Sequence, residues 1–429
     1  MNPSDLVLSR ATPHLPHNRQ GGTISSHTMR CSQVNDNDDV LRISWKGIEC
    51  MAKIYFNNAA SSWPKAPGIG QVIAQAVEEL PSHPGRTGYA VDSDHMQVCR
   101  EQLAALLGTN DPERIVLCQS ATYALNFALL GFPFRRGDVV LTSAQEHNSV
   151  LRPLYQLRRE RKIRLHIIPV NHEGRVELKD IEEAIHEHSP RLTVLNHASN
   201  VTGAVQPIAE VFSLAKTAGS TTLLDASQSL GLVPAHCAVL NADMVAFTGH
   251  KYLLGPTGSG GLFVSKTVDL DPVITGGTGV CSDLTGMPAN FPDRLEPGTP
   301  NVPAFSALAY ALRWQDKEPV NQTELDQLVE RLVEGLSRAG ANVVTVQPPR
   351  TPVVSFTLPD WKVGDVGYAL QTSFDIICRS GLHCAPLIHN HLGTAPEGTL
   401  RLSLSRFNTA EEIDFAIETV ARLVSREAG

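Results

Sequence analysis

Residues Met244–Gly258 read MVAFTGHKYLLGPTG and place one lysine, Lys251, between a short apolar run and a turn rich in glycine and proline. The apolar run, Met244–Phe247, has the length and composition of a buried strand. Thr248 and His250 can donate hydrogen bonds to a phosphate, and the glycines allow the backbone to approach a ligand closely. A lone lysine would be an ordinary surface residue, but this combination favours a site where the amine holds an aldehyde ligand.

A carboxyl group is predicted at the same edge of the fold. Leu223–Gln228 reads LLDASQ, so Asp225 follows an apolar strand. Open α/β sheets bind ligands at the carboxyl ends of their strands, and an acid there can keep a pyridine ring protonated. Taken alone, such an aspartate is more often the N-cap of a helix. Asp225 and Lys251 are 26 residues apart, enough for one crossover to return to the same edge, so the pair carries more weight than either residue.

Short apolar runs alternate with amphipathic stretches over residues 53–300. The runs predict strands at Ile115–Cys118, Val139–Leu141, Leu192–Leu195, Thr221–Leu224 and Met244–Phe247. Stretches such as Thr122–Leu130 and Ile208–Ala218 predict helices between them. This alternation is typical of βαβ units, and it predicts an α/β fold with a mainly parallel sheet covered on both faces.

The pattern changes after about residue 300 to long amphipathic helices and short strands. Helices are predicted at Ala304–Asp316, Thr323–Ala339 and Val363–Thr372 and from Ala410 onward, and strands at Asn342–Val346, Val353–Thr357 and Thr399–Ser403. We therefore expect a large domain at 53–300 and a small C-terminal α+β domain at 301–429, with which part of 53–80 can pack. Residues 1–52 show no apolar periodicity, which predicts a disordered extension or a start of translation at Met51, with a targeting segment as the alternative.

The composition excludes several classes of protein. The 429 residues are 42% hydrophobic and 19% charged, which rules out a mostly disordered chain. The net charge of −8 argues against nucleic acid or anionic lipid as the main partner. No run of 18 apolar residues is present to span a membrane. The eight cysteines form no CxxC pair, so we expect reduced thiols and a cytoplasmic protein.

Three further segments carry polar side chains at predicted strand ends. Cys118–Thr122 runs from a strand into a helix, whose N-terminal amides and hydroxyls can hold a phosphate, although an ordinary capped helix would look the same. Glu146–Ser149 follows the next strand with an imidazole that can stack on a ring. His197–Gly203 supplies an amide side chain at a third strand end.

These five segments, in this order, resemble those of the pyridoxal-phosphate (PLP) enzymes of the class V aminotransferase group, in particular its cysteine desulfurase-like branch. The resemblance begins at about Ile54, where Tyr55–Ala60, YFNNAA, matches the family's opening, and it runs to the C-terminus. It leaves residues 1–50 uncovered. It implies the type I PLP fold, with a seven-stranded, mainly parallel sheet in the large domain and a small C-terminal domain, and it implies a homodimer.

The resemblance also implies a role for each residue that matches a family motif. Lys251 matches the lysine that binds the cofactor covalently, Asp225 the partner of the pyridine nitrogen, and His147 the histidine that stacks on the ring. Gln228 matches the residue bonded to the phenolic oxygen, and Asn200 the asparagine beside the ring and the substrate. The remaining matches bind the phosphate, namely Ala121, Thr122, Thr248 and His250 in the same subunit and Thr299, within Glu296–Asn301, in the neighbouring subunit.

One cysteine is expected to carry sulfur. Arg379–Pro386, RSGLHCAP, resembles the family's loop with the persulfide-forming cysteine, here Cys384. A nucleophilic cysteine needs thiolate character and access, which a mobile glycine-containing loop beside Arg379 and His383 can provide. A cysteine taken alone is more often a buried apolar residue. Arg401 matches the arginine that binds the substrate carboxylate, with which Arg379 is also expected to interact.

The same region admits a metal site as an alternative. His383, His389 and His391 lie near Cys384 in the sequence, and four such ligands can bind zinc. The resemblance already accounts for His383 and Cys384, so we predict no metal.

Two residues depart from the family's pattern, and one further cysteine is conspicuous. Asn57 stands where relatives often carry Asp, which we interpret as an effect on a local turn. Ser227 stands where alanine is usual, and its hydroxyl should fit. Cys281 falls in a loop expected near the dimer contact and is an alternative reactive thiol.

The expected activity is that of a cysteine desulfurase, which converts L-cysteine to L-alanine and leaves a persulfide on Cys384 for transfer to an acceptor protein or small molecule. Lys251, Cys384 and His147 are the expected catalytic residues, and Lys251 is the expected base for the Cα proton. The alternatives are a selenocysteine lyase, another class V PLP lyase or aminotransferase without a cysteine nucleophile, and a PLP-binding protein that is no longer catalytic.

Overall fold

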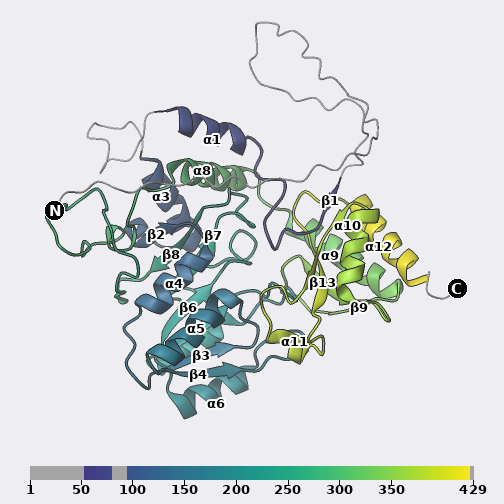
Figure 1. Ribbon diagram of the computed structural model, residues 1–429, viewed down its shortest axis with the longest axis horizontal. Helices are drawn as coiled ribbons and strands as arrows, with labels where there is room; N and C mark the ends of the chain where they lie inside the picture. The colour runs from purple at the N-terminus through teal and green to yellow at the C-terminus, as the bar shows by residue number, and fades with distance from the viewer. Residues whose placement is uncertain (1–52, 80–93, 426–429) are drawn as a thin grey trace, which may run out of the picture. The chain divides into compact units, whose positions relative to one another are not determined.

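A computed structural model describes residues 53–79 and 94–425 of the chain (Figure 1). The extension expected at residues 1–52 lies outside the described residues. Among the helices of the described part, none combines the length and the apolar character needed to cross a bilayer.

A seven-stranded sheet forms the centre of the large domain, as expected. Its order is β2 (Ile115–Cys118), β8 (Gly260–Val264), β7 (Met244–Thr248), β6 (Thr221–Asp225), β5 (Leu192–Asn196), β3 (Val139–Ser143) and β4 (Arg164–Ile168). All neighbours are parallel except that β8 runs antiparallel to both β2 and β7. The five strands predicted from the sequence are therefore confirmed. Sequence reasoning missed β4, a half-exposed edge strand, and β8, which begins with two glycines.

Helices cover both faces of this sheet, which explains why its central strands are largely apolar. One core lies between the sheet and α3 (His95–Leu107), α6 (Leu178–His188), α7 (Ile208–Thr217) and α8 (Val302–Lys317). The other lies between the sheet and α4 (Ala121–Gly131) and α5 (Asn148–Glu160). Successive residues of β6 divide between the two cores, Leu223 to one and Leu224 to the other, as the period-two geometry of a strand requires.

The small domain is built on a four-stranded antiparallel sheet. Its strands, in order, are β12 (Arg379–Gly381), β13 (Thr399–Ser403), β10 (Val353–Thr357) and β9 (Asn342–Val343). Its core is completed by α9 (Gln322–Arg338), α10 (Val363–Ser373) and α12 (Ala410–Ser425). The short α11 (Ile388–His391) lies between β12 and β13 in the chain.

One segment from each side of residue 300 packs with the other domain. At the start of the described chain, β1 (Ile54–Tyr55) pairs in parallel with β11 (Ile376–Ile377) of the small domain. Conversely, α8 packs with the large sheet, because Phe305 and Leu308 belong to its core, and α1 (Ile69–Glu78) lies along α8 (Figure 1). The apolar face of α8, which begins just after the boundary expected at residue 300, is thus buried against the large sheet.

The loop between β5 and α7 fastens the two domains together. The Ser355 hydroxyl donates to the Val201 carbonyl oxygen at 2.6 Å, and the Thr351 amide donates to the Gly203 carbonyl oxygen at 2.8 Å. Gly203 has φ +82°, and a Cβ there would lie 2.8 Å from the Thr351 carbonyl oxygen. Glycine is thus required both by the backbone conformation and by the close approach of the small domain.

We expect Gly203→Ala to destabilise the protein by more than about 2 kcal/mol, because the new methyl group adds a backbone clash to the cost of positive φ. Gly219→Ala is the matched control, since Gly219 has φ +80° and a Cβ there would meet no heavy atom within 4 Å. This control should lose about 1 kcal/mol. Urea unfolding of both variants tests the difference, and equal losses would show that the domain contact contributes nothing.

Candidate active site

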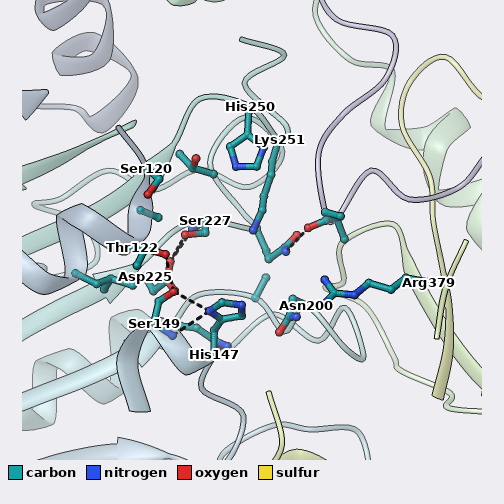
Figure 2. Close-up of a pocket in the computed structure, with 18 of the residues that line it drawn as sticks. Ser120, Thr122, His147, Ser149, Asn200, Asp225, Ser227, His250, Lys251 and Arg379 are labelled. Atoms are coloured by element: carbon teal, nitrogen blue, oxygen red, sulfur yellow. Dashed lines mark hydrogen bonds between the residues drawn. The ribbon is translucent and has the colours of Figure 1, made fainter. Parts of the chain in front are cut away.

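A cavity of about 230 Å³ opens at the carboxyl edge of the large sheet (Figure 2). Strands β2, β3, β5, β6 and β7 all end there, because they point in one direction. The lining contains most residues singled out from the sequence, namely Ala121, Thr122, His147, Asn200, Asp225, Gln228, Thr248, His250, Lys251, Arg379 and Arg401. Cys384 and Thr299 are not part of this lining. Sequence reasoning did not assign roles to Ser120, Ser149 and Asn196, which also line the cavity.

Lys251 points into the cavity from the turn after β7 (Figure 2). Burial lowers the pKa of its amine to about 8, although the carboxyl group of Asp225 acts in the opposite direction. Within the described part of the chain its ammonium group forms no ion pair or hydrogen bond. A lysine with a pKa near 8 has an appreciable fraction of neutral amine at neutral pH, which is the form that reacts with carbonyl groups.

Asp225 is the last residue of β6, and its carboxyl group is buried in the cavity wall. One oxygen, Oδ1, accepts hydrogen bonds from the Ser227 amide at 2.9 Å and from the Ser227 hydroxyl. The hydroxyl of Ser227 therefore fits, as expected. No lysine, arginine or histidine among residues 53–79 and 94–425 forms an ion pair with Asp225. A buried carboxyl group without a cationic partner is suited to a ligand that presents a protonated ring nitrogen.

His147, Ser149 and Thr122 form a hydrogen-bonded chain along one wall (Figure 2). The Ser149 hydroxyl lies 2.8 Å from the Thr122 hydroxyl and 2.9 Å from His147 Nδ1, and the Ser149 amide donates to the same nitrogen at 3.1 Å. Because an amide can only donate, Nδ1 carries the lone pair and the proton is on Nε2. Burial and, secondarily, Lys251 lower the pKa of His147 to about 4, so its ring is neutral at physiological pH.

The end of the cavity at α4 is suited to an anion. Ser120 is the N-cap of α4 and makes no capping hydrogen bond with its side chain, so the first-turn amides face the cavity without that partner. Hydroxyl groups of Ser120, Thr122 and Thr248 and the ring of His250 surround this end. Gly260 allows the approach, since a Cβ there would lie 2.9 Å from the Ser120 backbone. This arrangement can hold a phosphate.

Several amide oxygens in or near the wall lack partners among the described residues. Asn196 Oδ1, Asn200 Oδ1 and Gln228 Oε1 are buried and accept no hydrogen bond. The amino groups of all three side chains are occupied, because Asn196 donates to the Gln145 carbonyl oxygen at 3.1 Å, Asn200 to the His383 carbonyl oxygen at 2.7 Å and Gln228 to the Ala59 carbonyl oxygen at 2.9 Å. Since buried polar atoms are normally hydrogen-bonded, these oxygens indicate a polar ligand in the cavity.

Two arginines close the opposite part of the site. Arg401 is 1% exposed, and its guanidinium donates to the Asn200 carbonyl oxygen at 2.9 Å and to Asn57 Oδ1 at 3.0 Å. Burial, with a further contribution from Arg379, lowers its pKa to about 10, so it remains charged. The side chain of Asn57 thus accepts a hydrogen bond from Arg401. Our interpretation that this residue affects a local turn is wrong.

Cys384 lies next to Arg379, which is a residue of the cavity lining. The Arg379 guanidinium is 3.2 Å from the Cys384 sulfur. Its loop is anchored to the large domain, because the Asn148 amide donates to the Cys384 carbonyl oxygen at 2.7 Å and Asn200 binds the preceding residue. The ring of His383 is directed to Thr399, 3.0 Å from its carbonyl oxygen. Burial lowers the pKa of His383 to about 2, so it supplies no positive charge to the thiol.

The remaining predicted residues lie elsewhere. Thr299 is exposed, on a segment held in place by Glu296, which accepts from Arg100 and from the Leu117 amide, each at 2.5 Å. Cys281 is exposed on a loop outside the cavity. In the described ranges no group of three histidine, cysteine or acidic side chains is placed to hold a metal ion.

The buried histidines predict loss of stability in acid. Burial lowers the pKa of His147, His197 and His250 to about 4 each. In the unfolded chain these groups take up protons near pH 6.5. Between pH 6.5 and 4 the unfolded state therefore binds more protons, and the free energy of unfolding falls as the pH falls, by about 2 kcal/mol per histidine at pH 5.

The urea midpoint should therefore drop between pH 7 and pH 5, and the drop should be smaller in His197→Asn. A midpoint that does not change over this range would contradict these burial effects.

Comparisons with known proteins agree with this geometry. The sequence profile of the aminotransferase class-V family matches residues 54–415. A probable cysteine desulfurase of Methanothermobacter thermautotrophicus is 29% identical over 380 residues, covering 85% of this chain and 94% of that protein. A probable cysteine desulfurase of Pyrococcus abyssi is 32% identical over 390 residues, covering 86% of this chain and 94% of that protein.

Solved structures show the same fold. The apo structure of a cysteine desulfurase from Thermococcus onnurineus NA1 is 28% identical, covers 87% of this chain and 95% of that chain, and gives a TM-score of 0.80. The structure of the cysteine desulfurase CsdA of Escherichia coli, with an S-sulfonic acid, is 26% identical, with the same coverage of both chains and a TM-score of 0.77. With the fold, the cavity and the sequence profile in agreement, the chain belongs to the aminotransferase class-V family.

Proposed function

We propose that this protein is a PLP-dependent cysteine desulfurase that converts L-cysteine to L-alanine and collects the sulfur as a persulfide on Cys384. The observation that carries the proposal is the composition of one cavity. It combines a lysine amine of lowered pKa, a buried carboxyl group that forms no ion pair among the described residues, and two arginines, one of which contacts a cysteine sulfur. The relatives described above support this activity, since they carry the name of cysteine desulfurases.

The residues of the cavity fit PLP. When bound, PLP supplies an aldehyde for amines and a protonated ring that withdraws electrons from the α-carbon of an amino acid. Lys251 would bind the aldehyde, Asp225 the ring nitrogen, and His147 one face of the ring. Thr122, Thr248, His250 and the N-terminus of α4, including Ala121, would hold the phosphate. The unpartnered oxygens of Asn200 and Gln228 support a polar ring at this position.

The chain's own groups suit the steps that desulfuration requires. The planar guanidinium of Arg401, with Arg379 beside it, can bind the carboxylate of the amino acid through paired hydrogen bonds. The neutral amine of Lys251 can accept the Cα proton and later return it. His147 can donate from Nε2 only, because its other nitrogen accepts from Ser149.

Sulfur transfer balances without an added oxidant. The Cys384 thiolate attacks the sulfur of the substrate, and a sulfur–sulfur bond forms as the substrate's Cβ–S bond breaks. The electron pair of that bond stays with the carbon skeleton, which takes up a proton and leaves as alanine. The Arg379 guanidinium lies 3.2 Å from the sulfur of Cys384, beside the position of this attack.

The proposal extends to partners and location. We propose a homodimer in which Thr299 reaches the neighbouring subunit's phosphate site, because this residue is exposed on a firmly held segment. The persulfide would pass to an acceptor protein or small molecule. A cytoplasmic location is supported by the six cysteines of the described part, which are all free thiols.

The sulfur step is tested with Cys384→Ala. Incubation of the wild-type protein with L-cysteine should add the mass of one sulfur atom to the peptide that contains Cys384 and release alanine. The variant should lose at least about 100-fold in alanine release, because its nucleophile is gone. Cys281→Ala is the control, since this cysteine is more exposed but lies outside the cavity, and it should behave as wild type. Alanine release that persists in Cys384→Ala would refute the persulfide mechanism.

The covalent attachment is tested with two lysines. Borohydride treatment of the holoenzyme should fix a pyridoxyl group on Lys251 and on no other residue. Lys65 is the matched comparison, because burial lowers its pKa to about 8 as well, but its amine donates to the His250 carbonyl oxygen and lies outside the cavity lining. Lys251→Ala should abolish the label and Lys65→Met should keep it. A label that survives Lys251→Ala would overturn the assignment.

A further inference from the structure

The side chain of Asn57 is held against Arg401 by the backbone. Just after β1, the Ser403 amide donates to the Phe56 carbonyl oxygen at 2.8 Å, and the Asn58 amide donates to the Ser403 carbonyl oxygen at 3.3 Å. This pairing places residue 57 beside the end of β13, which carries Arg401. The turn itself is formed by main-chain atoms, since the Ala60 amide donates to the Asn57 carbonyl oxygen at 3.0 Å. The amide side chain is therefore not needed for the turn.

Arg401 has only neutral partners. Its two terminal nitrogens donate to the Asn200 carbonyl oxygen and to Asn57 Oδ1, and its Nε has no partner among the described residues. No aspartate or glutamate of residues 53–79 and 94–425 forms an ion pair with it, and the charged groups that act on it most are Arg379, Tyr252 and Cys384. Burying a guanidinium without an anionic partner lowers the stability of the folded protein, and this protein nevertheless buries Arg401 in that way.

Residue 57 decides whether this charge is compensated. Asparagine and aspartate have the same shape, so an aspartate at this position could accept the same hydrogen bond from Arg401 and would add a negative charge about 3.0 Å away. A substrate carboxylate would then compete with a fixed internal carboxylate for the guanidinium. The amide oxygen of Asn57 orients Arg401 through a hydrogen bond without adding a negative charge. The full positive charge of Arg401 is therefore available to the ligand.

We propose that Asn57 is a positioning residue that sets the affinity of this site for the carboxylate of its amino-acid substrate, by orienting Arg401 without neutralising it. The identity of that amino acid as L-cysteine rests on the proposed function. The arrangement of charge does not, since it follows from the contacts of Asn57 and Arg401 alone. The buried positive charge is compensated only when a ligand carboxylate arrives.

The test is Asn57→Asp in the holoenzyme. The KM for L-cysteine should rise about tenfold, with kcat changed less than about threefold, because one charge-assisted contact is weakened in ground state and transition state alike. The Kd for L-alanine, measured by calorimetric titration, should rise by a similar factor. The Tm should rise by about 2 °C, because the buried guanidinium gains a partner. Opposite changes in affinity and stability are not expected of a merely structural defect.

Two further variants separate charge from position. Asn57→Ala removes the acceptor without adding charge, so it should lower the Tm and weaken L-alanine binding less than Asn57→Asp does. Asn342→Asp adds the same charge at an exposed residue of β9 and should change neither affinity nor Tm. Unchanged alanine binding in Asn57→Asp, or equal weakening in the Asp and Ala variants, would overturn the inference.

The two proposals fail in different ways. Wild-type protein that releases no alanine from L-cysteine would refute the proposed function, and the L-alanine titration and the Tm would still decide the role of Asn57. Conversely, wild-type turnover of L-cysteine together with unchanged alanine affinity in Asn57→Asp would leave the proposed function intact and refute this inference.

Discussion

The common direction of strands β2, β3, β5, β6 and β7 is the constraint on which the rest of the structure depends. Because these strands end at one edge, side chains that are far apart in the chain meet in a single cavity (Figure 2). Each strand is largely buried and ends at or next to a polar residue. The polar residues at these carboxyl ends therefore meet at one edge, and the position of the site follows from the packing of the sheet.

Within that cavity the protein maintains an excess of positive charge. Lys251, Arg379 and Arg401 line the same space, and Asp225 is the acidic residue among its lining. Glu146 lies behind the wall, but burial raises its pKa to about 8, so it is mostly uncharged at neutral pH and accepts hydrogen bonds from Ser143 and Asn196. An anionic ligand is thus attracted to a region in which Lys251 and Arg401 form no ion pair with an acidic residue of the described part of the chain.

The reactive groups come from both domains, and contacts between the domains fix their relation. Asn200, in the loop that follows β5 of the large sheet, takes part in two of these contacts. Its side chain donates to the loop of Cys384, and its carbonyl oxygen accepts from Arg401. The amide of Asn148, next to His147, holds the carbonyl oxygen of Cys384. A shift of the small domain would therefore move the sulfur nucleophile and the carboxylate-binding arginine together relative to the edge of the large sheet.

The sequence alone determined five central strands, the helices α4 and α7, most helices of the small domain and most of the polar residues that line the cavity, because burial on two faces leaves apolar runs and motif residues sit at their ends. It missed β4 and β8, whose exposure or glycine content hides the strand pattern, and it did not show that α8 packs against the large sheet. Only the tertiary structure decided the partners of Asn57, the orientation of His383 and the link from Ser149 to His147. These depend on hydrogen bonds set by the backbone geometry of a loop or by segments distant in the chain, and no local pattern of residues encodes them.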